Sequence, residues 1–192
     1  MTGQVKLSSY EEAGLLAAAA LVNALAIEHE YGRPVSRRIE VLPALARILA
    51  VDPASVARLG ADDAPRFIAL ARRLRAVFRD LQAGNVDAAA GRLNDLLASH
   101  PAHPHLAKEH GLWRLHHHPV EAALAPMWTA ICAEGLARAI GRGDAHRLGT
   151  CAGSDCDRVF YDSSKNASRR FCSTTCQNRV KTAAFRRRAK AG

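Results

Sequence analysis

The feature that most constrains this chain is a set of four cysteines in its last quarter. Cys151 and Cys156 are separated by four residues, Cys172 and Cys176 by three, and fifteen residues lie between the two pairs. Two short cysteine pairs joined by a spacer can turn four thiolates toward one tetrahedral ion. A segment of about forty residues is too small to fold on an apolar core of its own. The spacing therefore predicts a structural metal site.

Zinc is the ion that this pattern favours, with one structural Zn²⁺ per chain bound by all four thiolates. Four protein ligands leave no open position for water or substrate, which argues against a catalytic metal here. Two alternatives stay open from the spacing alone: an iron–sulfur cluster on the same ligands, and four free thiols. The fifth cysteine, Cys132, follows Trp128 in a predicted helix and is expected to be a small buried residue.

The segment between and after the cysteine pairs predicts a treble-clef-like zinc finger. A strand over residues 158–162 is followed by a turn and by a returning strand over residues 169–172. Thr174 and Gln177 form a T-x-x-Q capping box, which begins a helix that carries Cys176 in its first turn. The predicted order is knuckle, hairpin and helix.

Positive charge is concentrated in the same part of the chain. The full chain has a formal net charge of +9, of which residues 151–192 carry +7 and residues 1–150 carry +2. An acidic partner is therefore expected to meet the C-terminal segment first.

The helix after Cys176 is the predicted nucleic-acid contact. Arg179, Thr182 and Arg186 share one helical stripe, and arginine can form bidentate hydrogen bonds with base edges. The alternative is a solvated basic helix end, which the helix dipole favours by itself. Attachment to a zinc platform favours nucleic acid. The residues expected to contact it are Asn178, Arg179, Lys181, Thr182, Arg186, Arg187, Arg188 and Lys190.

The rest of the chain predicts a mainly α fold. Hydrophobic residues make up 48% of the sequence but aromatic residues only 5%, which favours close-packed helices of Ala and Leu. A small β-hairpin is expected within residues 101–118. We expect the boundary near Gly143 to divide a helical domain, residues 1–143, from a zinc finger, residues 144–192. The helices are predicted over residues 10–31, 38–51, 53–60, 63–84, 85–100 and 120–140.

Several classes of protein are disfavoured by what the sequence lacks. A phosphate-binding glycine loop, a nucleophile elbow and an HExxH motif are all missing, so we do not expect an enzyme. The Ala/Leu-rich run over residues 13–27 is too short for a membrane span. Without a secretory signal, the odd number of cysteines indicates a reduced, cytoplasmic protein. Histidines crowd residues 100–118, but no helical ligand pair stands out among them, so a second metal site there is disfavoured.

The cysteine segment also resembles a known family. The stretch from Cys151 through VFYDSSKNASRRFCS to CQNRVKTAAFRRR resembles the CGNR-type zinc finger of bacterial regulators. The preceding region resembles the ABATE domain found with that finger, through LVNAL at residues 21–25 and LWRLHHHP at residues 112–119. The family's namesake glycine is Gln177 here, which leaves the metal ligands untouched but alters a point where bare backbone would approach DNA.

The resemblance implies a stress-responsive, DNA-binding transcription regulator whose helical domain senses a small-molecule ligand or forms a homodimer. Two other functions compete with it. The same basic finger suits an RNA- or ribosome-associated protein. Oxidation of the thiolates would release the zinc, which makes a redox switch the third hypothesis.

Overall fold

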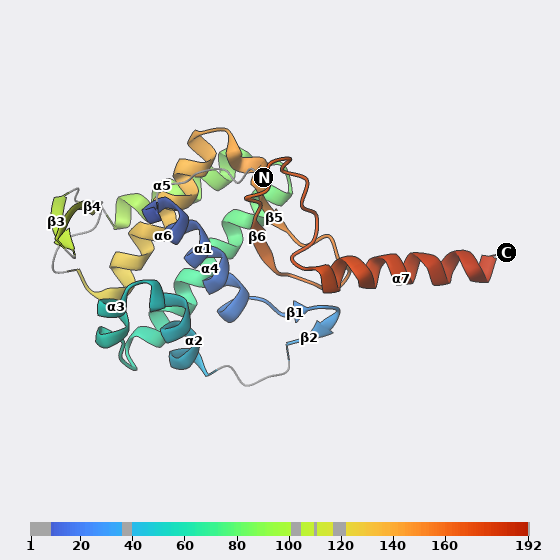
Figure 1. Cartoon of the computed structure of the whole chain (residues 1–192), viewed down its shortest axis with the longest axis horizontal. Helices are drawn as coiled ribbons and strands as arrows, with labels where there is room; N and C mark the ends of the chain where they lie inside the picture. The colour runs from blue at the N-terminus through green and yellow to red at the C-terminus, as the bar shows by residue number, and fades with distance from the viewer. Residues whose placement is uncertain (1–8, 36–39, 101–104, 110, 117–121, 192) are drawn as a thin grey trace.

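The computed structural model describes residues 9–35, 40–100, 105–109, 111–116 and 122–191, and within them the predicted mainly α fold is confirmed (Figure 1). The helices are α1 (Ser9–Leu25), α2 (Val41–Ile48), α3 (Pro53–Arg58), α4 (Asp63–Gln82), α5 (Val86–Ser99), α6 (Leu124–Gly141) and α7 (Thr174–Ala191), with 3₁₀ turns at Leu49–Val51 and Asp144–Arg147. Antiparallel ribbons pair β1 (His29–Glu30) with β2 (Arg33–Pro34), β3 (His105–Glu109) with β4 (Leu112–His116), and β5 (Leu148–Thr150) with β6 (Val159–Tyr161).

The centre of the helical body is the crossing of α1 and α6. A Cβ added to Gly14 would lie 2.5 Å from the carbonyl oxygen of Ile131, and one added to Gly135 would lie 2.9 Å from the backbone nitrogen of Leu15. The two backbones approach closely because neither glycine carries a side chain. Helices α4 and α5 complete the body. The largest fully buried side chains include Leu15, Leu21, Phe67, Leu74, Phe78, Leu93, Trp128 and Leu136.

Local sequence signals set several helix boundaries as predicted. The Asp52 side chain accepts a hydrogen bond from the backbone nitrogen of Ala54 at the start of α3. The Asn85 side chain accepts one from Ala88 at the start of α5. Each cap satisfies a backbone donor that the first helical turn leaves unpaired. The predicted helix after residue 120 begins at Leu124, which places Pro126 in the first turn of α6, where proline is tolerated.

The first helix ends earlier than predicted. It stops at Leu25 and not near Tyr31, and residues 29–34 form the small β1–β2 ribbon instead. Tyr31 and Gly32, with φ of 54° and 86°, make the tight turn of that ribbon. The chain leaves the helix because the backbone of residues 28–32 forms hydrogen bonds with a distant segment, residues 155–157.

The predicted hairpin within residues 101–118 is present as the β3–β4 ribbon. Its register pairs Lys108 with Trp113, and Gly111 turns the chain with φ of 83°. Trp113 is 65% exposed. The ribbon lies at the opposite end of the molecule from α7 (Figure 1).

The β5–β6 ribbon joins the finger to the helical body. Leu148, Val159 and Tyr161 belong to the same buried apolar cluster as the helices. The Asn23 side chain donates to the carbonyl of Val159 over 2.9 Å and accepts from its backbone nitrogen over 2.8 Å. The expected boundary near residue 143 therefore precedes a ribbon that shares the main core. Independent folding of residues 1–143 stays a prediction.

The prediction of a returning strand in the finger hairpin is wrong. Residues 169–172 form a loop, and β6 pairs with β5, which lies before the first cysteine. The loop is shaped by Asp162, whose carboxylate accepts hydrogen bonds from the backbone nitrogens of Ser164 and Arg169. The carbonyl of Arg170 accepts from the backbone of Ala152. These contacts replace the ladder that a second strand would form.

Candidate metal centre and basic helix

Three short segments bring the cysteines together. Cys151 and Cys156 begin and end the loop after β5, Cys172 lies in the loop before α7, and Cys176 lies in the first turn of α7. The helix cap is Ser173, whose hydroxyl accepts a hydrogen bond from the backbone nitrogen of Cys176 over 3.4 Å. The capping box predicted at Thr174 is therefore displaced by one residue, because Thr174 is already helical.

The sulfur atoms have the spacing that zinc requires. The Sγ atom of Cys176 lies 3.7 Å from those of Cys156 and Cys172, which lie 3.8 Å from each other, and all four Sγ atoms lie within 4.8 Å of one another. Zinc–sulfur bonds of about 2.3 Å at tetrahedral angles place sulfur atoms about 3.8 Å apart. An iron–sulfur cluster would separate the thiolates further, because several atoms lie between them. The geometry fits one structural zinc.

The protein environment shifts the pKa values of Cys151 and Cys176 in opposite directions. Burial raises the pKa of Cys151, but hydrogen bonds from the backbone nitrogens of Cys172 and Gly153, each 3.4 Å from its Sγ atom, outweigh burial and lower it overall. Burial, together with the contact to the Cys156 thiol, raises the pKa of Cys176 to about 11. The thiolate of Cys151 therefore forms more readily than that of Cys176, from which zinc must displace the proton.

A second set of contacts shapes the loop that presents Cys172. Asp162 is 3% exposed, and although burial raises its pKa, the hydrogen bonds from Ser164 and Arg169 lower it overall. The Arg169 guanidinium lies 4.6 Å from the centre of the Phe160 ring, and its Nε atom donates to the carbonyl of Phe171 over 3.0 Å. The sequence pattern assigned no role to these residues. The sequence feature that could have identified them is the segment that begins with the aromatic residues before Asp162 and ends with the arginines before Cys172.

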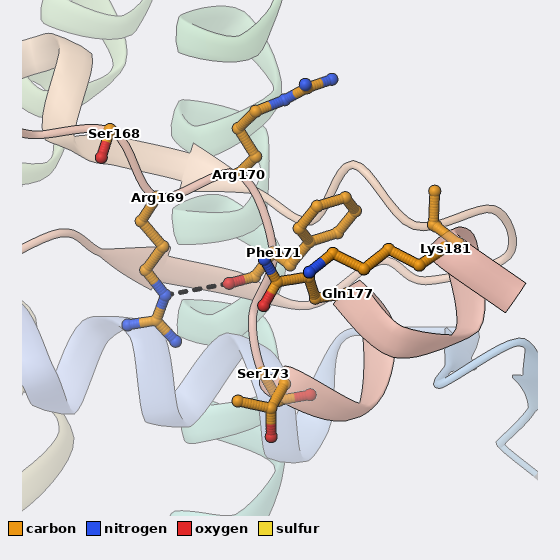
Figure 2. Close-up of a pocket in the computed structure, with 9 residues that line it drawn as sticks. Ser168, Arg169, Arg170, Phe171, Ser173, Gln177 and Lys181 are labelled. Atoms are coloured by element: carbon orange, nitrogen blue, oxygen red, sulfur yellow. Dashed lines mark hydrogen bonds between the residues drawn. The ribbon is translucent and has the colours of Figure 1, made fainter. Parts of the chain in front are cut away.

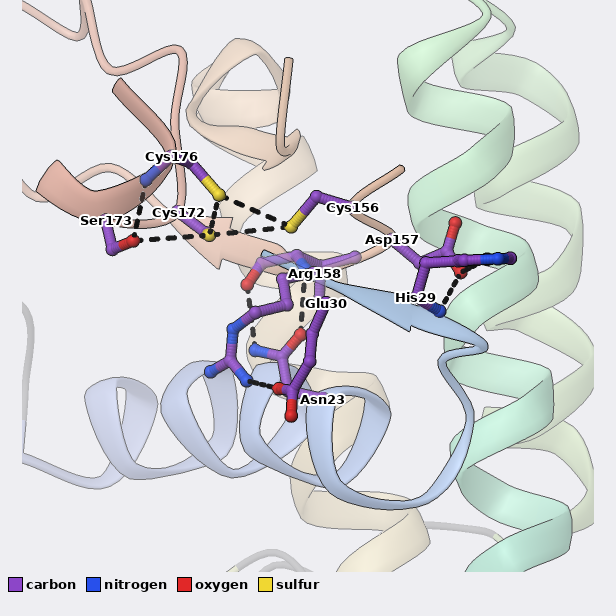
Figure 3. Close-up of polar contacts among 10 residues, drawn as sticks. Asn23, His29, Glu30, Cys156, Asp157, Arg158, Cys172, Ser173 and Cys176 are labelled. Atoms are coloured by element: carbon purple, nitrogen blue, oxygen red, sulfur yellow. Dashed lines mark hydrogen bonds and ion pairs between the residues drawn. The ribbon is translucent and has the colours of Figure 1, made fainter. Parts of the chain in front are cut away.

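The β1–β2 ribbon contacts the residues that directly follow Cys156 (Figure 3). One carboxylate oxygen of Asp157 accepts from the backbone nitrogens of Glu28, over 3.0 Å, and His29, over 2.9 Å. The same oxygen lies 3.3 Å from the Arg75 guanidinium. The sequence pattern does not predict this contact, because its partners lie more than 120 residues apart.

Arg158 and Gly32 complete the contact with the β1–β2 ribbon. Arg158 pairs with Glu30 over 3.1 Å. The backbone nitrogen of Gly32 donates to the carbonyl of Asp155 over 2.9 Å. The metal loop thus rests on side-chain and main-chain contacts from the same ribbon.

Arg179 occupies a different environment from the other basic residues of α7. Its guanidinium donates to the carbonyl of Ser154, next to the metal loop. A Cβ added to Gly32 would lie 1.2 Å from its Nη1 atom, so the guanidinium fills the space that this glycine leaves. In this position Arg179 braces α7 against the β1–β2 turn. Its predicted contact with bases stays a prediction.

The other predicted contact residues lie on exposed helix. Beyond its first turns α7 extends away from the body, and its sequence contains no acidic residue (Figure 1). Phe185, in the same stretch, is 67% exposed. The exposed residues among the predicted contacts are Asn178, Lys181, Thr182, Arg186, Arg187, Arg188 and Lys190.

Comparison with known proteins supports the finger. Residues 147–189 match the CGNR zinc finger family, a stretch that contains all four cysteines and most of α7. No curated protein matches the chain. Among the described residues, no helix combines the length and the apolar character needed to cross a membrane.

Proposed function

We propose that this chain is a DNA-binding transcription regulator in which the CGNR zinc finger of residues 147–189 contacts the DNA. One observation carries the proposal: α7 holds a cysteine of the metal cluster in its first turn and then extends into solvent with five exposed basic residues and no acidic one. Such a helix has no apolar face that the helical body needs. An anionic partner gives this arrangement a use.

The dimensions of α7 suit duplex DNA. Its 18 residues span about 27 Å. A helix of this kind enters the major groove, where arginine and asparagine side chains can reach base edges. The finger anchors one end of the helix through Cys176, which supplies the rigid orientation that a groove contact needs.

The helical body is assigned the regulatory part of the function. Its resemblance to the ABATE domain supports a stress-responsive role, with either a small-molecule ligand or a second copy of the chain as the partner. We place this regulator in the cytoplasm and assign it no enzymatic activity. Four protein ligands around one zinc leave no coordination site for a substrate.

A second candidate is binding to single-stranded RNA. It is favoured by Phe185, whose ring is 67% exposed beside three consecutive arginines. An exposed aromatic ring next to cations is the arrangement on which unpaired bases stack. Under this function, Phe185 and not the arginine stripe would contribute most to binding.

Competition between the two nucleic acids tests the proposal. The full-length zinc protein is titrated into a fluorescein-labelled duplex DNA of about 20 base pairs, two helical turns, and bound duplex is challenged with unlabelled single-stranded RNA of the same length. Duplex binding that resists RNA and falls steeply with salt supports the proposal. Preferential displacement by RNA, lost in Phe185→Ala, supports the second candidate. Absence of binding to either nucleic acid rejects both.

A further inference from the structure

A groove lies on the finger between the loop before Cys172 and the first turns of α7 (Figure 2). It has a volume of about 610 Å³ and opens to solvent. The zinc cysteines do not line it. Its lining consists of polar and basic side chains with two apolar ones: Ser168, Arg169, Arg170, Phe171, Ser173, Thr174, Gln177, Val180 and Lys181.

Two of the three cations in the groove are available to a ligand. Arg169 is engaged, since it stacks on Phe160 and donates to the carbonyls of Phe171 and Cys172. Arg170 and Lys181 are exposed, and within the described residues their side chains form no hydrogen bond or ion pair. The only contact of the Arg170 guanidinium among these residues is with the Phe171 ring, 6.0 Å from its centre, and this leaves its N–H donors unpaired. In the view of Figure 2 the Phe171 ring lies between them. The groove thus presents two exposed positive charges on either side of one aromatic ring.

No carboxylate lines the groove. The sequence contains no Asp or Glu after Asp162. The carboxylate of Asp162 is buried under the loop, and that of Asp157 is engaged by the β1–β2 ribbon and Arg75. The groove therefore suits an anion with several negative charges in a row, such as a phosphodiester backbone.

The groove also shows which side of α7 faces it. Successive helical residues rotate by about 100°, so Gln177, Lys181 and Arg188 lie along one side. Arg179 and Arg186 lie on the opposite side. Arg188 continues the line of the groove toward the free end of α7.

We propose that the phosphate backbone of the bound nucleic acid lies in this groove, held by Arg170 and Lys181, and that Gln177 faces it. This rests on the nucleic-acid binding proposed above and specifies the side of α7 from which the partner approaches. The side is opposite to the stripe of Arg179, Thr182 and Arg186. It adds Arg170, from outside α7, to the contact.

Two double variants with equal loss of charge test the inference. The first, Arg170→Gln with Lys181→Gln, removes the free cations of the groove. The second, Arg186→Gln with Lys190→Gln, removes exposed cations on the opposite side of α7. A third, Arg72→Gln with Arg73→Gln on exposed positions of α4, controls for net charge. Each is titrated into the labelled duplex at several salt concentrations, and zinc content is measured alongside.

The groove variant should show the largest change. Each lost phosphate contact lowers the salt slope by about 0.9, so the double substitution should lower it by about two and should weaken binding more than the other two variants. Lys181→Glu alone is the second test if Arg170→Gln reduces zinc content, and it should weaken binding further than Arg186→Glu. A groove variant that binds like the α4 control, while the opposite-face variant loses its salt dependence, overturns the inference and leaves nucleic-acid binding intact. A wild-type protein that binds no nucleic acid overturns the proposed function itself.

Discussion

The helical body and the zinc finger are stabilised in different ways. The body buries a continuous cluster of Leu, Phe and Trp side chains, whereas the finger's own cluster consists of four cysteines with Phe171 packed against them. Burial of apolar area supplies the folding free energy of the first region. A metal ion must supply it in the second, because so few apolar side chains are available there. The difference shows that one short chain can join two regions that respond to different perturbations.

The largest effect should come from removing a zinc ligand. Cys172→Ser should abolish zinc binding, because only three thiolates remain to bind the ion and the tetrahedral site is no longer closed. Structural zinc contributes about 10–16 kcal/mol of apparent binding free energy. Metal analysis should find no bound zinc, and circular dichroism should retain most of the helix signal of the body. Cys132→Ala, in the buried cysteine outside the cluster, should keep its zinc. Full zinc content in Cys172→Ser would contradict the assignment of the ligands.

The next largest effect is expected from a comparison of two phenylalanines, one in each region. Phe78 is fully buried in α4, whereas Phe185 is 67% exposed on α7. Phe78→Ala should lower the free energy of unfolding by about 3–5 kcal/mol, through lost transfer free energy and the cavity left behind. Phe185→Ala should change it by less than about 0.5 kcal/mol. Denaturant melts followed by circular dichroism measure both. Equal effects would show that α7 packs on an apolar surface, against the picture of an extended helix.

The connection between the two regions is tested at Asn23. Asn23→Ala leaves the backbone nitrogen and carbonyl of Val159 without their side-chain partners, which should cost about 2 kcal/mol. Because β6 belongs to both regions, the variant should also release zinc to a chelator faster than wild type does. The control is Asn94→Ala, the same chemical change at an exposed position of α5. Unaltered zinc release would mean that the two regions are energetically independent.

The smallest change in stability is expected from substituting Asp162, and this change should depend on pH. Its folded pKa is lower than its ordinary value of 3.8, so its contribution to stability is complete above that value and is lost as the pH falls through the folded pKa. Asp162→Asn should destabilise the finger by about 1–2 kcal/mol at neutral pH. The difference from wild type should shrink in acid, as measured by thermal melts of the zinc protein across a pH series. A constant difference at all pH values would assign the effect to packing. Asp62→Asn, at an exposed position, is the matched control.

Local patterns in the sequence predicted the parts of the molecule that are set by residues close together in the sequence. The cysteine spacing identified the metal cluster, and Asp52 and Asn85 marked the starts of helices through contacts only two or three residues long. The end of α1 was predicted too late for a different reason. Its true end depends on a loop whose residues are more than 120 positions away, and no local pattern records that contact.

The same distinction explains Arg179. As a member of a helical stripe it was predicted to contact bases, with bracing of the finger as the alternative, because it lies one turn from the cysteine ligands. The structure separates it from the rest, because its guanidinium fills the space over Gly32 and reaches the carbonyl of Ser154. A glycine 147 positions earlier was needed to define its surroundings, and only the folded chain brings the two together.

Because α7 is anchored at the metal site and its other end is free, it can act as a lever arm that rotates about that site. Arg179 connects the arm, close to the pivot, to the β1–β2 turn, and this turn follows directly from α1 in the helical body. For an arm of about 27 Å, a rotation of about 10° at the pivot moves the tip by about 5 Å. That displacement exceeds the spacing of successive base pairs. If α7 contacts DNA as proposed, a small rearrangement near Gly32 would be magnified at the free end of α7 into a shift of more than one base pair.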